Sequence, residues 1–91
     1  MYVKSVVIKN KTGLHARPAA EFVSCAKKYS SDIQVRRTGA AEGASAKSMM
    51  RVLSQCLCQG VTVEISARGE DEEQAVEALA ALVESGFGEE E

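Results

Sequence analysis

The sequence predicts an α+β fold, an open-faced two-layer sandwich in which three helices cover one face of a four-stranded antiparallel sheet. Apolar and polar residues alternate strictly over 61–68, which is typical of a strand with one face in water. Apolar residues recur at helical spacing over 16–29 and 71–86, and the elements follow in the order β-α-β-β-α-β-α. A chain of 91 residues supports one core, so we expect a single domain over residues 1–91.

The first elements are a strand, a loop and a helix. Residues 2–8 are rich in β-branched side chains and predict a strand, which the loop at 10–14 follows. The helix over 16–29 has Lys27 and Lys28 in its last turn, where cations complement the helix dipole. Its apolar positions, which we expect in the core, are Ala19, Phe22, Val23, Ala26 and Tyr29.

A hairpin and a short helix are expected next. Ile33 and Val35 alternate with polar residues, and the turn at 38–39 leads into a weak second strand within 40–46. Residues 48–57 are apolar nearly all round and predict a short, partly exposed helix that Gly60 stops.

The last two elements carry the clearest patterns. The strand over 61–68 is followed by a helix in which Asp71 can cap the first turn, with Gln74 three residues on. Gly86 is placed to end this helix. Its expected buried stripe is Ala75, Val76, Leu79, Leu82 and Val83.

Charge is distributed unevenly along the chain. Residues 1–69 hold eleven basic and four acidic side chains, whereas residues 70–91 hold nine acids and no base. We expect Lys47 and Arg51 to join Arg17 as cations near one site, which favours an acidic or phosphate-bearing protein partner. Nucleic acid is a poor candidate, because the chain has two Tyr, two Phe and no Trp and a pI near 5.4.

The sequence predicts a reduced, cytoplasmic protein. No stretch is long and apolar enough for a membrane span, and the first residues lack the pattern of a signal peptide. Three cysteines, Cys25, Cys56 and Cys58, argue against a disulfide framework. Cys56 and Cys58 stand two apart with a single distant histidine, which is a weak signal for a metal.

The strongest candidate for chemistry is His15, the only histidine of the chain, where the loop meets the first helix. Gly13 can adopt the turn before it, and Pro18 suits a first helical turn, where its missing N–H would be unpaired in any case. His15 then falls at or beside the N-cap, next to unpaired amides and the forked cation of Arg17. A nucleophilic nitrogen beside an anion site suits a phosphorylated histidine, although a lone histidine before a helix is more often only a cap or surface residue.

Two segments resemble the HPr family of histidine-containing phosphocarrier proteins. Residues 11–20, K-T-G-L-H-A-R-P-A-A, resemble the active-site signature of that family. Residues 45–48, S-A-K-S, and the two methionines after them resemble its regulatory-serine helix. The resemblance covers essentially the whole chain and implies the β-α-β-β-α-β-α sandwich of the family.

The resemblance implies a carrier in the bacterial phosphoenolpyruvate-dependent sugar phosphotransferase system. Such a carrier takes a phosphoryl group from enzyme I and passes it to sugar-specific IIA domains, through a phosphohistidine and without a cofactor. His15 would be phosphorylated through Nδ1 and Arg17 would steady the phosphoryl group. Thr12, Gly13, Ala16 and Pro18 would shape the active-centre loop.

The second segment implies a regulatory site and a docking surface. Ser48 would be the target of an ATP-dependent HPr kinase, although an N-cap for its own helix is the plainer reading. Met49, Met50 and Leu53 would dock partner proteins or pack in the core, and Arg51 matches a basic position of the family. The stretch 40–46 is about two residues longer than in common members of the family, and Cys56 stands where many have Gly.

Two other functions remain open at this point. One is a regulatory phosphoprotein that acts on kinases or transcription factors in a cell with an incomplete phosphotransferase system. The other is a thiol or metal-binding module built on Cys56 and Cys58, which would hold stoichiometric zinc. Nothing in the sequence demands more than a monomer.

Overall fold

The structure is a computed structural model that describes residues 1–88, and its sheet has four strands. They are β1 (Tyr2–Val7), β2 (Asp32–Arg37), β3 (Ala44–Ser45) and β4 (Thr62–Arg68). The order across the sheet is β1-β4-β2-β3, and every neighbouring pair is antiparallel. The predicted sheet is therefore confirmed, including a second hairpin strand that is only two residues long.

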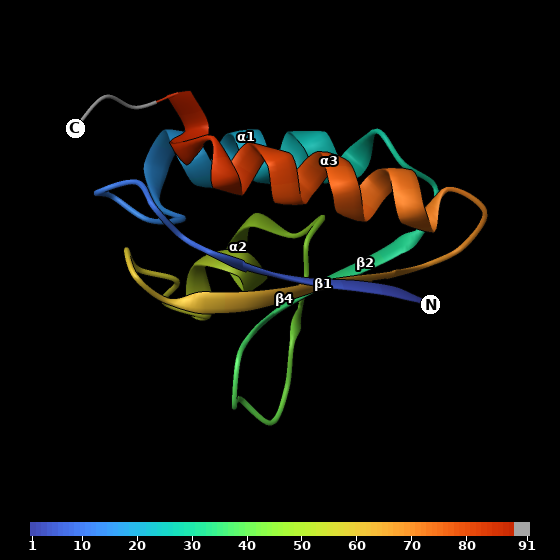
Figure 1. The fold of residues 1–91 in the computed structure, drawn as a ribbon, viewed down its shortest axis with the longest axis horizontal. Helices are drawn as coiled ribbons and strands as arrows, with labels where there is room; N and C mark the ends of the chain where they lie inside the picture. The colour runs from blue at the N-terminus through green and yellow to red at the C-terminus, as the bar shows by residue number, and fades with distance from the viewer. Residues whose placement is uncertain (89–91) are drawn as a thin grey trace.

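Three α-helices accompany the sheet, in the predicted order. They are α1 (Ala16–Lys27), α2 (Met49–Ser54) and α3 (Glu72–Glu84), and a 3₁₀ turn, η1 (Gly86–Gly88), follows. Figure 1 shows α1 and α3 side by side above the sheet, whereas the hairpin between β2 and β3 projects from the opposite face. The short α2 contacts α1 and β3. Within residues 1–88, none of the helices has the length and apolar character needed to cross a bilayer.

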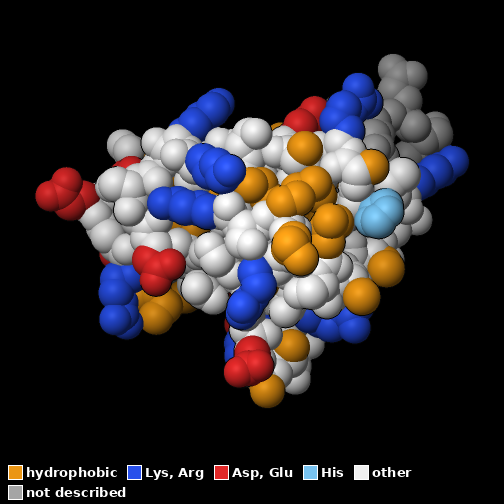
Figure 2. Space-filling view, turned by 180° about the vertical axis from the view of Figure 1, so that it is seen from behind, with side chains coloured by type: hydrophobic (Ala, Val, Ile, Leu, Met, Phe, Trp, Pro, Cys, Tyr) orange, Lys and Arg blue, Asp and Glu red, His pale blue; other side chains and the backbone are white. Residues whose placement is uncertain are grey.

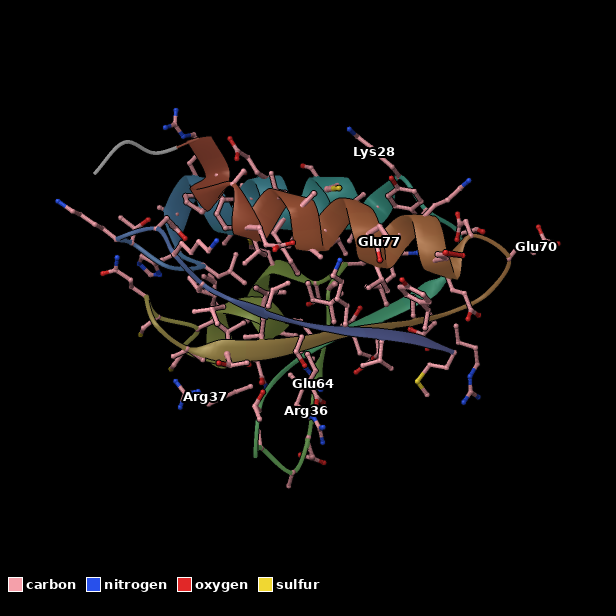
Figure 3. The ribbon with its side chains drawn as sticks, in the orientation of Figure 1. Lys28, Arg36, Arg37, Glu64, Glu70 and Glu77 are labelled. Atoms are coloured by element: carbon pink, nitrogen blue, oxygen red, sulfur yellow. The ribbon has the colours of Figure 1, made fainter. Side chains whose placement is uncertain are left out.

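The alternation over β4 divides its side chains between the core and the open face of the sheet. Val63, Ile65 and Ala67 are buried beneath the helices. On the open face, Arg36 of β2 lies opposite Glu64 in the strand register and forms an ion pair with it (Figure 3). One face of this sheet therefore supports the core and the other is solvated, as an antiparallel sheet allows.

The helices bury the faces that the sequence predicts, with two changes. In α1 the buried residues include Ala19, Phe22, Val23 and Ala26, whereas Tyr29 lies beyond the end of the helix and is only partly buried. In α3 the predicted residues Ala75, Val76, Leu79 and Val83 are buried, as is Ala80, whereas Leu82 is only partly buried at the margin of the core.

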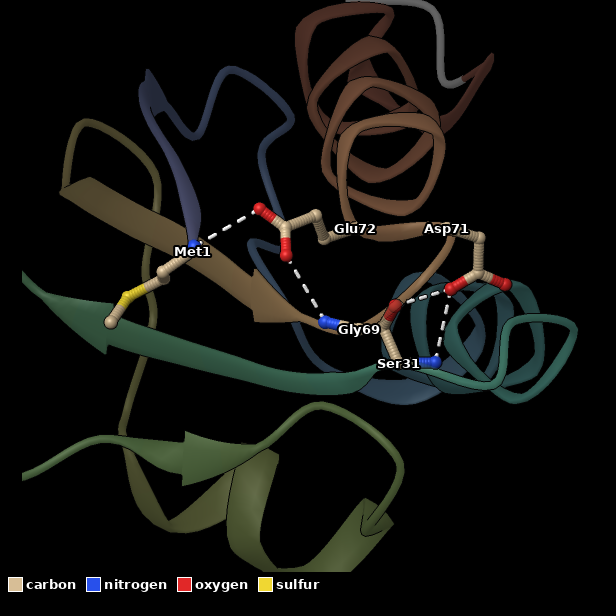
Figure 4. A network of polar contacts seen from close by, with 5 residues as sticks. All are labelled: Met1, Ser31, Gly69, Asp71 and Glu72. Carbon is tan, nitrogen blue, oxygen red and sulfur yellow. Dashed lines mark hydrogen bonds and ion pairs between the residues drawn. The ribbon is translucent and has the colours of Figure 1, made fainter.

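The predicted cap position at Asp71 is confirmed, but the expected capping bond is absent. Asp71 is the N-cap residue of α3, but its side chain makes no capping hydrogen bond. Its carboxylate instead accepts the backbone N–H and the hydroxyl of Ser31 (Figure 4). It also accepts the backbone N–H of Ser30. These donors lie about 40 residues away in the chain, so the carboxylate fastens the start of α3 to the turn between α1 and β2.

The expected stop of α2 at Gly60 is wrong. The helix ends at Ser54, and Cys56 adopts the left-handed conformation with φ of 53°. A left-handed residue just past a helix ends its hydrogen-bonded ladder. Leu57, which follows, is buried in the core, so the chain turns inward four residues earlier than the glycine suggested. By contrast, Gly86 has φ of 69° just past the end of α3, as predicted.

Candidate functional site

The loop that precedes His15 is built on a turn from Asn10 to Gly13. The carbonyl of Asn10 accepts the N–H of Gly13 at 3.2 Å. The side-chain amide of Asn10 donates to the carbonyl of Gly13 at 2.9 Å and to the hydroxyl of Thr12 at 3.1 Å. Asn10 is 1% exposed, so these bonds form in the interior, beneath an exposed Thr12.

Gly13 and Leu14 then lie against the segment that follows α2. The N–H of Leu14 donates to the carbonyl of Leu57 at 2.8 Å. Gly13 has φ of 66°, and a Cβ there would approach the Leu57 carbonyl oxygen to 2.4 Å. Only glycine fits both the conformation and the space. The backbone entering the site is therefore held by residues more than 40 positions away.

His15 is the N-cap residue of α1, as predicted. Its backbone is extended, with φ of −145° and ψ of 152°, and its exposed side chain makes no capping hydrogen bond. The first amides of a helix have no intrahelical acceptor, and such donors can bind an anionic ligand. Ala16, the next residue, has φ of 54°. A left-handed alanine is strained, and such strain persists only where the surrounding structure enforces it.

Arg17 and Pro18 lie in the first turn of α1 and differ in their exposure to solvent. Arg17 is exposed, so its guanidinium is free to meet a group held at His15, whereas Pro18 is buried. Together with the helix amides, Arg17 gives the surface around His15 the chemistry of an anion site.

The residues expected on the docking surface lie on α2, with Ser48 as its N-cap. The hydroxyl of Ser48 accepts the N–H of Arg51, which confirms the capping role. Met50 is 82% exposed and Arg51 is exposed, whereas Met49 and Leu53 are partly buried. Val52 alone of this helix is fully buried, so most of α2 faces away from the core. Figure 2 shows the single histidine, in pale blue, beside a group of hydrophobic side chains at the surface.

Lys47 does not lie near the site, contrary to expectation. Its ammonium donates to the carbonyl of Tyr29 at 2.7 Å, just past the C-terminal end of α1. His15 lies at the other end of that twelve-residue helix, about 18 Å away at 1.5 Å per residue. Lys47 therefore satisfies a carbonyl near the end of α1 that is far from His15.

No metal site is formed by the cysteines. The thiols of Cys56 and Cys58 are free and exposed, and Cys25 is free and partly buried. Within residues 1–88, no three His, Cys, Asp or Glu side chains gather closely enough to hold a metal ion. A groove between α1 and α3, lined by Ala20, Ser24 and Leu82 among others, includes none of the candidate site residues.

Asn10 and Leu57 are the site-forming residues that the sequence did not reveal. Asn10 reads as an ordinary loop residue, and Leu57 as one more apolar residue of a helix. The only signal for Asn10 is a polar residue shortly after a strand and two residues before a Thr-Gly pair. Leu57 contributes its backbone carbonyl, and because every residue has one, the sequence cannot single it out.

Known proteins match the chain over almost its whole length. The family model described as the PTS HPr component phosphorylation site matches residues 2–85. The chain belongs to the HPr family. Phosphocarrier protein HPr of Haemophilus influenzae is 52% identical over 83 residues, which cover 91% of this chain and 95% of that protein.

Solved structures of HPr proteins have the same fold. The crystal structure of HPr from Thermoanaerobacter tengcongensis matches with a TM-score of 0.95 and 50% identity, over 100% of both chains. Crh of Bacillus subtilis, a catabolite repression protein solved as a domain-swapped dimer, is 41% identical with a TM-score of 0.72, over 94% of this chain and 97% of that chain. As a member of the HPr family, this protein is a phosphocarrier of the phosphotransferase system.

Proposed function

We propose that His15 is the residue that carries the phosphoryl group, accepting it from enzyme I and passing it to sugar-specific IIA domains. The observation that carries this proposal is the position of His15: exposed at the N-cap of α1, with no capping bond to the helix amides. A carrier must face two partners in succession, and an exposed ring at a helix terminus can do so.

The surroundings of His15 suit reversible phosphoryl transfer. In the first transfer a bond forms between phosphorus and Nδ1 of the ring while the bond from phosphorus to enzyme I breaks. In the second transfer a bond forms between phosphorus and the IIA acceptor while the bond from phosphorus to Nδ1 breaks. Transfer depends mainly on in-line positioning and on stabilising charge. The α1 amides and Arg17 would bind the phosphoryl oxygens through charge-assisted hydrogen bonds, while Thr12, Gly13, Ala16 and Pro18 shape the loop that presents the ring.

The surface for both partners is the outer face of α2. Met50 supplies exposed apolar surface, Met49 and Leu53 widen it, and Arg51 adds a positive charge. Exposed apolar surface with cations nearby favours an acidic protein partner with an apolar centre. We propose no cofactor for the transfer, because enzyme I delivers a phosphoryl group that is already activated.

The direct test is phosphorylation by enzyme I and phosphoenolpyruvate. The unaltered chain should acquire acid-labile phosphate, and His15→Ala should acquire none while keeping its melting temperature. Arg17→Ala should still be labelled, but about tenfold or more slowly, since a hydrogen bond to a charged group contributes about 1.5–3 kcal/mol. Equal labelling of the unaltered chain and His15→Ala would refute the assignment.

We also propose that Ser48 is a regulatory phosphorylation site for an HPr kinase. Its hydroxyl heads α2, directly before Met49 and Met50, so a phosphate there would bring two negative charges onto the docking surface. Ser48→Asp should weaken binding to enzyme I, whereas Ser85→Asp, an exposed serine beyond α3, should not. Unchanged affinity of Ser48→Asp for enzyme I would contradict the proposal.

A regulatory phosphoprotein is the second candidate, and the likeness to Crh favours it. In that case the protein would act on kinases or transcription factors, and phosphate on Ser48 would matter more than transfer from His15. Transfer from phosphorylated His15 to a IIA domain separates the two functions, since only a carrier returns the phosphoryl group.

The remaining proposals concern the state in which the protein acts. We propose a monomer of one domain, residues 1–91, that works in the cytoplasm and binds neither nucleic acid nor membrane. Free thiols at Cys56 and Cys58 fit a reducing compartment. Light scattering during gel filtration tests the monomer, and a dimer mass at micromolar concentration would contradict it.

A further inference from the structure

Asn10 connects the end of β1 to the loop that carries His15. Two residues before it, Ile8 extends the pairing between β1 and β4, because its N–H donates to the Val61 carbonyl and its carbonyl accepts the Gly60 N–H. Asn10 therefore stands where the sheet ends. It is one of two buried polar residues among those described, the other being Ser31.

The bonds of Asn10 converge on a single neighbour. The carbonyl of Asn10 takes the N–H of Gly13, and its side-chain amide donates to the carbonyl of Gly13. Both backbone polar groups of Gly13 are thus held by one residue. The second proton of the amide goes to Thr12, so the donor end of the side chain is fully used.

The backbone between Asn10 and His15 has little conformational freedom. Gly13 is fixed by Asn10 and packed on the Leu57 carbonyl, and Leu14 is buried and bonded to that same carbonyl. His15, which follows Leu14, is exposed. On the far side of His15 stands the left-handed Ala16, whose strain the surrounding structure must maintain.

We propose that Asn10 is a positioning residue for phosphoryl transfer: its buried amide fixes the peptide groups that lead into His15 and so sets the place of the ring. The inference rests on the proposed role of His15. Asn10 touches no reacting atom, and it acts through Gly13 and Leu14.

The orientation of the amide supports this role over a purely stabilising one. The side-chain oxygen of Asn10 has no hydrogen-bond partner among the described residues, whereas both donor bonds point to the active loop. A reversed amide would set its oxygen against the Gly13 carbonyl. The hydrogen bonds to Thr12 and Gly13 therefore fix the orientation of the Asn10 amide.

The test compares Asn10→Ala with Ser31→Ala. Ser31 is the matched control because it is also buried and polar, but it bonds to Asp71 beyond the far end of α1 from His15. Both variants are assayed as substrates of enzyme I with phosphoenolpyruvate, well below their melting temperatures. For Asn10→Ala we expect kcat to fall about tenfold, since small displacements of a reacting group cost this much or more, while KM stays within about twofold.

A second variant, Asn10→Asp, isolates the donor bonds. It keeps the shape of the side chain but offers no proton to Gly13 or Thr12. We expect a fall in kcat at least equal to that of Asn10→Ala, together with faster hydrogen exchange at the Leu14 amide in both variants. Ser31→Ala should change neither quantity.

The outcomes separate the inference from the function on which it rests. If the unaltered chain takes no phosphate on His15, the proposed function fails. If it is labelled normally and Asn10→Ala and Asn10→Asp keep kcat within about twofold, or Ser31→Ala loses as much, the positioning role is wrong.

Discussion

At the scale of single residues, Gly13 combines two requirements. It needs a positive φ, and it has no room for a Cβ beside the Leu57 carbonyl. Gly13→Ala should therefore lower the free energy of unfolding by more than the roughly 1–2 kcal/mol that a left-handed conformation costs alanine. Urea denaturation measures this loss, and the rate of phosphorylation by enzyme I should fall with it.

Gly39 supplies a matched control for that substitution. It has φ of 92°, but a Cβ there would meet nothing within 4 Å. Gly39→Ala should show the cost of the backbone conformation alone. If both variants lose the same stability, the close approach of Gly13 to Leu57 contributes nothing.

The three cysteines should differ in reactivity. Cys56 and Cys58 are exposed, whereas Cys25 is partly buried and burial raises the pKa of its thiol. A raised pKa leaves less thiolate at a given pH, and the thiolate is the reactive form. We expect two thiols to react rapidly with a chromogenic disulfide at pH 8 and the third slowly. Single Cys→Ser variants assign the phases, and a fast Cys25 would contradict the burial seen here.

Most residues whose role follows from their immediate neighbours could be predicted from the sequence. His15 at the N-cap, Pro18 in the first turn and the turn at Gly13 all follow from their immediate neighbours. Asn10 was missed although its partners Thr12 and Gly13 are close in the chain, because the sequence does not show that its side chain is buried. Asp71 owes its role to residues about 40 positions away. Asp71 looked like a helix cap and instead binds the turn at Ser30 and Ser31.

At the scale of elements, the strength of the pattern decided what could be predicted. The seven residues of β4 alternate without a break, and the strand and its buried face match the prediction. The sequence of α2 is apolar on every side, so its pattern did not predict the residue at which the helix ends. The helix stops where Leu57 enters the core, which a local pattern does not contain.

The shortness of α2 makes its cap important. The helix has six residues, and Ser48 holds the N–H of Arg51 at its start. Ser48→Ala should lower the free energy of unfolding by about 1 kcal/mol, the usual cost of losing a serine cap. Ser48→Asp should restore stability because aspartate also caps, even though we expect it to weaken binding to enzyme I.

Comparing urea denaturation with enzyme I binding separates these two effects. A Ser48→Asp variant that is as unstable as Ser48→Ala would show that the hydroxyl does not cap α2. Met50→Ala, which changes an exposed side chain on the same helix, should leave stability unchanged while weakening the docking of enzyme I.

At the scale of the whole molecule, acidic residues of the last third fasten α3 to the rest of the chain. Glu72 pairs with the N-terminal ammonium and accepts the Gly69 N–H (Figure 4). Glu77 accepts from the Tyr2 hydroxyl and pairs with Lys4 at 3.0 Å. Glu72 therefore connects the start of α3 to the residue before β1, and Glu77 connects the helix to β1 itself. Acidic residues of the segment 70–91 thus pair with cations at the start of the more basic segment 1–69.

This fastening should make stability depend on pH in acid. Hydrogen bonds from Ser31, from the Gly69 N–H and from the Tyr2 hydroxyl lower the pKa values of Asp71, Glu72 and Glu77 respectively, from ordinary values of 3.8 for the aspartate and 4.5 for the glutamates. Protonation therefore favours the unfolded chain. The stabilisation is complete above the ordinary values and is lost as the pH falls through the lowered ones.

We expect the melting temperature to stay nearly constant from about pH 7 to pH 5 and to fall steadily below about pH 4.5. Circular dichroism melting curves across this range measure the fall. An Asp71→Asn, Glu77→Gln variant should melt lower at pH 7, because amides accept these bonds less strongly than carboxylates, and should lose less on acidification. Both differences follow from the same lowered pKa values, so parallel pH profiles for the two proteins would show that the acid sensitivity arises elsewhere in the chain.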